Sequence, residues 1–171
     1  MAKEQQVSGT SQGSEKKAKT ETGTNGAPAQ VPGKMTLFER LGGEQGITAI
    51  VEDFTARALE DPRVDWDRKG TKRSGFFGRG NSSAWTATPT NVVTLKKHLV
   101  QFLTLATGGP AKYDGKEIKP VHADMHISNP EFDATIGDLK ASLDKLRIPD
   151  KEQKELLAIV ESTRPQIVTQ R

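Results

Sequence analysis

The sequence predicts an all-α domain over residues 35–171. Apolar residues recur there at the three- and four-residue intervals of amphipathic helices, and polar caps, double glycines and prolines bound these runs. No segment shows the apolar–polar alternation of a half-buried strand. Residues 1–34 contain almost no large apolar side chain, so we expect a disordered polar tail before the domain.

The first two helices follow Thr36, which is a suitable N-cap. A short helix ends at Gly42 and Gly43, and a longer one ends before Pro62. The apolar positions of the longer helix have helical spacing: Ile47, Ile50, Val51, Phe54, Ala58 and Leu59.

Residues 61–91 break every periodicity, so we expect an extended loop within the domain. The loop mixes turn residues and charges with the aromatic residues Trp66, Phe76, Phe77 and Trp85. Its segment 67–80 carries five Lys or Arg residues against one Asp. Loops of about thirty residues are unusual in compact domains and are often functional.

The segment NVVTLKKHLVQFLTLA predicts the next helix, which Gly108, Gly109 and Pro110 end. His98 lies inside its apolar stripe, between Leu95 and Leu99. Such a histidine is either bonded to a carbonyl or solvent at the edge of the stripe, or is a ligand. The rest of the stripe is Phe102, Leu103 and Ala106.

An irregular stretch through Tyr113 leads to KPVHADMHI, residues 119–127, which holds two of the three histidines. The four-residue spacing of His122 and His126 would suit a divalent ion on a helix, but no third ligand is evident. Ser128 and Glu131 have capping-box spacing and predict a further helix with apolar positions at Phe132, Ile136, Leu139, Leu143 and Leu146. A last helix is expected from about Asp150, with Arg164 and Pro165 near its end.

The composition excludes several classes of protein. The chain has no cysteine, which rules out disulfides, thiolate metal sites, thiol nucleophiles and covalent haem attachment through cysteine. No run of residues is long and apolar enough for a membrane span, so we expect no membrane partner and a cytoplasmic location. An exported form, with its signal outside this sequence, stays an open alternative.

Three features together suit a noncovalent haem pocket. The chain is mostly helical and has no cysteine, one histidine lies on an apolar helix face, and another lies just before a helix cap. Haem iron takes a neutral imidazole from one side, and helices must enclose its apolar macrocycle.

The sequence resembles the group I truncated haemoglobins in the order of four motifs. These are LFERLGGEQGITAIVEDFTARALEDPRV, LKKHLVQFLTLATGGPAKYDG, KPVHADMHIS and FDATIGDLKASLDKLRIPDKEQKELLAIV. The resemblance covers most of residues 35–168 and implies a two-over-two helical sandwich. It also implies haem b as the cofactor, with His122 as the proximal iron ligand. His126 stands where many members have glycine. The predicted haem-binding residues further include Phe54, Leu95, Leu99, Phe102, Tyr113 and Ile127.

Some positions depart from the family pattern. Thr55 and Leu99 replace the tyrosine and glutamine that usually hold bound oxygen, so we expect few hydrogen-bond donors on the distal side. His98 matches a distal histidine of some cyanobacterial relatives, which makes it a second iron ligand or a hydrogen-bond donor. For the aromatic residue that packs on the haem, Trp66 and Phe77 both qualify.

The resemblance implies a globin that reversibly binds a diatomic gas, O2, NO or CO, in oxygen binding or transport. We expect a binding protein rather than an enzyme, with nitric oxide dioxygenation by way of a reductase electron donor left open. One alternative is a bis-histidine haem protein, with His122 and His98 as ligands, for electron transfer or redox sensing. The least favoured is a helical module that binds single-stranded nucleic acid through the basic, aromatic segment 67–80.

Overall fold

The computed structural model describes residues 34–66, 85–123 and 125–170. Their helices and strands are, in chain order, α1 (Leu37–Arg40), α2 (Gly43–Glu60), α3 (Pro89–Ala106), α4 (Ile118–His122), β1 (Ile127–Ser128), α5 (Asn129–Lys145), α6 (Asp150–Glu161), α7 (Arg164–Ile167) and β2 (Val168–Gln170).

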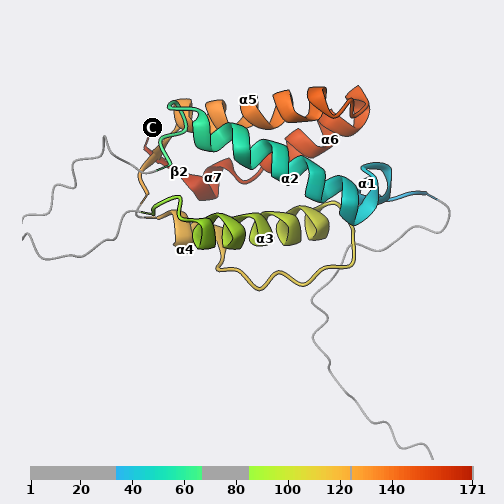
Figure 1. Ribbon diagram of the computed structural model, residues 1–171, viewed down its shortest axis with the longest axis horizontal. Helices are drawn as coiled ribbons and strands as arrows, with labels where there is room; N and C mark the ends of the chain where they lie inside the picture. Colours follow the sequence, from blue (N-terminus) through green and yellow to red (C-terminus); the bar gives the residue numbers. More distant parts are fainter. Residues whose placement is uncertain (1–33, 67–84, 124, 171) are drawn as a thin grey trace, which may run out of the picture.

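The four long helices lie side by side in Figure 1, with α5 at the top, α3 at the bottom and α2 crossing between them. Helix α2 packs against α3 on one side and against α5 on the other, and α5 packs against α6. The pair α2 and α3 therefore packs on the pair α5 and α6 through the contact of α2 with α5, which confirms the predicted all-α, two-over-two fold.

The core lies where α2 meets α5 and α6. Its fully buried aliphatic side chains are Ile47, Ile50, Val51, Leu143 and Leu156. Removing these side chains from water supplies the main stabilising term, roughly 1.5–3 kcal/mol for each. The helical periodicity in the sequence thus identified the faces that pack together.

Capping residues begin the helices as expected. Thr36 forms a capping box with Glu39, and the backbone N–H of Ser128 donates to Glu131 Oε2 at 2.6 Å. At the junction of α1 and α2, Gly42 and Gly43 have φ angles of +92° and +66°, which residues with a Cβ rarely adopt. The double glycine is therefore required by the reversal between these helices.

Three features were not predicted. Residues 118–122 form the short helix α4 instead of an irregular stretch. A parallel pair of strands, β1 and β2, occurs in a domain for which no strand was expected. Near the C-terminus, α6 ends at Glu161 and a new short helix begins at Arg164, with Pro165 in its first turn. All three depend on contacts between distant segments, which have no local periodicity.

Among the described residues, no helix has both the length and the apolar character that a membrane crossing requires.

Candidate functional site

His122 ends helix α4, and its imidazole is half-buried. Its Nδ1 atom lies 2.6 Å from the carbonyl oxygen of Ile118, one helical turn earlier. A carbonyl oxygen only accepts hydrogen bonds, so Nδ1 carries the hydrogen and donates it. The Nε2 atom therefore keeps its lone pair.

Burial lowers the pKa of His122 from the ordinary value of 6.5, and the bond to Ile118 only partly opposes this change. The imidazole is thus neutral at pH 7. A neutral histidine with Nδ1 fixed by a backbone carbonyl and Nε2 available is the form that ligates a metal.

His126 does not share a helix with His122. It is exposed and follows the end of α4, with a φ angle of +51°. The two histidines therefore do not form the i, i+4 pair that their spacing allowed. Among the described residues no group of three His, Asp or Glu side chains could hold a metal ion by itself.

The side chains of helix α3 lie in two environments. Leu103 and Thr104 are buried, whereas Leu95, Leu99 and Phe102 are only half-buried. Ile127, which follows His126 and lies in β1, is also half-buried. These four half-buried residues are among those predicted to line a haem pocket, and their incompletely covered apolar surface suits a large apolar group.

His98 shares this half-buried face of α3, with 34% of its side chain exposed. Its Nε2 atom lies 3.6 Å from Asp114 Oδ1, which is too far for a good hydrogen bond but close enough for an ion pair when the imidazole is protonated. Asp114 also accepts a hydrogen bond of 2.6 Å from Lys97 Nζ. The sequence did not reveal this partner, because Asp114 lies in an irregular stretch that folds back along α3.

Tyr113 joins the same cluster. Its ring lies 6.0 Å from the ring of His98 and 6.5 Å from that of Phe102, both in edge-to-face orientations. The segment after α3 thus brings an aromatic ring and a carboxylate to the half-buried face of the helix.

Helix α2 supplies Phe54 and Thr55, which are 7% and 0% exposed. The hydroxyl oxygen of Thr55 has no hydrogen-bond partner among the described residues. A buried hydroxyl without a partner is costly, and such groups often mark a site that is completed by a ligand.

Trp66 packs at the edge of the core. Its Nε1–H donates to the carbonyl oxygen of Ala58 at 2.7 Å, and its ring lies 5.5 Å from that of Trp85. Phe77 and the basic segment 67–80 lie outside the described residues. The choice between Trp66 and Phe77 as a haem contact therefore stays a prediction, as does nucleic-acid binding.

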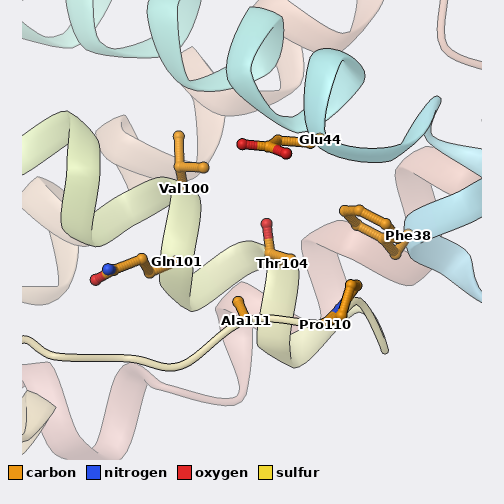
Figure 2. Close-up of a pocket in the computed structure, with 7 residues that line it drawn as sticks. All are labelled: Phe38, Glu44, Val100, Gln101, Thr104, Pro110 and Ala111. Atoms are coloured by element: carbon orange, nitrogen blue, oxygen red, sulfur yellow. The ribbon is translucent and has the colours of Figure 1, made fainter.

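A separate small cavity of about 150 Å³ lies between α1, the start of α2 and the end of α3. Figure 2 shows Phe38, Glu44 and Thr104 directed toward it, while the amide of Gln101 points away. No histidine and no predicted haem-binding residue lines it. Its volume is below the 300–1,000 Å³ that is usual for cofactor sites.

The predicted site residues fit a haem group by their chemistry. His122 offers a neutral nitrogen ligand, the half-buried side chains of α3 and β1 offer apolar contact, and Thr55 offers an unused hydroxyl.

The comparisons with known proteins identify the family of the chain. Residues 81–169 match the model of the bacterial-like globin family. The group 1 truncated haemoglobin of Tetrahymena pyriformis is 33% identical over 129 residues, which are 75% of this chain and 91% of the relative. That of Mycolicibacterium paratuberculosis is 30% identical over 134 residues, 78% of this chain and 85% of the relative.

Solved structures give the same result. The crystal structure of the truncated haemoglobin from Tetrahymena pyriformis in its Fe(III) form matches with a TM-score of 0.62 and 30% identity. The match covers 78% of this chain and 98% of that chain. By sequence and by fold, the chain belongs to the group 1 truncated haemoglobins and is a haem-binding globin.

Proposed function

We propose that the protein holds haem b through the Nε2 atom of His122 and reversibly binds a diatomic gas. The observation that carries this proposal is the position of His122 Nδ1, 2.6 Å from the carbonyl oxygen of Ile118, because a carbonyl can only accept the hydrogen and Nε2 is then free to bind a metal. Haem supplies an iron that accepts O2, NO or CO. Because the chain has no cysteine to tether the group, coordination and apolar burial must retain it.

The other residues of the site have supporting roles in this proposal. Leu95, Leu99 and Phe102 give apolar contact and exclude water from the face of α3. Thr55 offers a hydroxyl that can donate a hydrogen bond to a bound gas. One hydroxyl is a weak donor set, which favours modest oxygen affinity.

The test is to express the protein with a haem supply, and to compare His122→Ala with His126→Ala. The wild type and His126→Ala should purify red with a Soret band, whereas His122→Ala should lose most of its haem. Adding imidazole to His122→Gly should restore the spectrum. A His122→Ala protein with full haem and an unchanged spectrum would refute the proximal assignment.

A second candidate function is that of a bis-histidine haem protein, with His98 as the other ligand. The observation in its favour is that His98 lies on the half-buried face of α3, together with Leu95 and Leu99. Its imidazole must leave Asp114 to reach an iron. A low-spin, six-coordinate spectrum of the ferrous protein without added ligand would support this function over gas binding.

A further inference from the structure

The last residues of the chain lie against the segment that carries His122. Helix α7 packs on α4, and β2 pairs with β1 in parallel. In this pairing Ile127 lies opposite Val168, and Ser128 lies opposite Gln170. We call residues 164–170, which comprise α7 and β2, the C-terminal strap.

The segment from α4 to β1 has few other means of support. Helix α4 has five residues and none of them is buried. Among the described elements, its extensive contacts are with α7. Such short elements are unstable by themselves in water, so the orientation of α4 depends on the position of the strap.

The strap is in turn fixed to the core by Arg164. The guanidinium donates from Nη1 to Asn129 Oδ1 at 3.0 Å and from Nη2 to Asp133 Oδ1 at 2.6 Å, both on α5. It also bonds Glu161 at the end of α6. Its Cζ atom lies 4.4 Å from the ring centroid of Phe132, which is 3% exposed.

These contacts differ from an ordinary surface ion pair. The side chain of Arg164 is only 25% exposed, and its planar fork reaches three polar partners while stacking on a buried ring. A single residue at the start of the strap thus connects it to both α5 and α6.

We infer that Arg164 is a positioning residue for the proximal histidine: it anchors the C-terminal strap, and the strap holds α4 and β1 so that His122 keeps its orientation. The inference rests on the proposed role of His122 as the haem ligand.

The experiment compares Arg164→Gln, Arg164→Lys and Asp133→Asn with a matched control, Lys140→Gln. The control removes the 2.7 Å ion pair with Asp144 on the same helix α5, about two turns after Asp133. Hydrogen exchange of the haem-free full chain reports the opening of α4 and β1. In the haem-loaded protein, the rate of haem loss to an acceptor globin and the iron–histidine stretching frequency are measured.

Arg164→Gln should raise the exchange rate of residues 118–128 about tenfold, the ratio that corresponds to about 1.4 kcal/mol. Haem loss should accelerate and the iron–histidine stretch should shift or broaden. Asp133→Asn should give a smaller effect of the same kind. Arg164→Lys should be intermediate, since lysine keeps the charge but not the fork. Lys140→Gln should match the wild type in all three measurements.

If Arg164→Gln exchanges residues 118–128 no faster than Lys140→Gln does, the strap has no positioning role and the inference fails. The exchange measurement needs no haem, so it separates this failure from that of the proposed function. If His122→Ala keeps its haem while Arg164→Gln still loosens residues 118–128, the strap exists but does not serve the iron ligand.

Discussion

The imidazole of His122 and the carbonyl group of Ile118 are joined by a hydrogen bond of 2.6 Å within a helix of five residues. The bond spans a single turn, so unwinding of α4 would separate the two groups and free the ring to rotate. Burial lowers the pKa of His122 at the same time, which keeps the ring neutral. The orientation of the proposed iron ligand therefore depends on a short helix that needs tertiary contacts for its stability.

His98 should partition between Asp114 and the iron. We expect part of the ligand-free ferrous protein to be six-coordinate, and His98→Leu to convert it to a five-coordinate form that binds carbon monoxide faster. The reason is that an internal ligand must leave before an external one can bind. Absorbance spectra and flash photolysis measure both quantities. If His98→Leu changes neither of them, His98 is not an iron ligand.

Variants of Asp114 and Lys97 should shift the six-coordinate fraction in opposite directions. Asp114→Asn removes the carboxylate that attracts His98 and should raise the six-coordinate fraction about threefold, as a weak ion pair implies. Lys97→Ala removes the competitor for that carboxylate and should lower the fraction. Shifts of the two variants in the same direction would contradict the competition.

Thr55→Val should stabilise the haem-free protein by about 1–2 kcal/mol, because the variant replaces a buried hydroxyl without a partner by a methyl group of similar shape. In the haem-loaded protein the same change should accelerate oxygen dissociation by removing a donor. Urea unfolding and stopped-flow dissociation give the two values. Thr104→Val, on the buried side of α3, is the control for the kinetic effect.

Asp138 should make the fold less stable as the pH rises. Burial and the nearby charge of Asp61 raise its pKa, while Arg63 and Arg57 act in the opposite direction. A raised pKa means that the folded state favours the protonated acid. Stability is therefore full below the ordinary value of about 3.9 and is lost as the pH increases through the raised pKa.

Asp138→Asn should remove this loss, with a gain of about 1 kcal/mol at pH 7 and none near pH 3. Urea unfolding of the haem-free protein at the two pH values measures the difference. Asp144→Asn is the control, because the pKa of Asp144 is lowered by its hydrogen bonds to Lys140 and Gln153. That variant should lose stability at pH 7. An equal response of the two variants would contradict the assignment.

His126→Gly should be more stable than His126→Ala by about 1 kcal/mol, because only glycine adopts a φ of +51° without steric cost. Thermal unfolding shows which of the two variants is more stable. At the helical position Lys140 the order should be reversed, with alanine above glycine by about the same amount. Equal stability of the two variants at residue 126 would show that the left-handed backbone is relaxed in solution.

The sequence by itself determined the major helices and the fold class. Helical spacing predicted the burial of residues such as Ile47, Ile50 and Leu143. Capping chemistry predicted the helix starts at Thr36 and Ser128. These signals are local, since each involves residues within one or two turns. The same local order of motifs carries the resemblance that predicts His122 as the proximal ligand.

Tertiary structure alone decided the surroundings of the candidate site. The partner of His98 is Asp114, the orientation of α4 depends on α7, and Arg164 reaches Asn129 across 35 positions of the chain. None of these contacts corresponds to a periodicity or a motif spacing in the sequence, so none could be predicted from it. The short elements α4, β1, α7 and β2 lack the length to be stable alone, so distant packing rather than local propensity determined where they form.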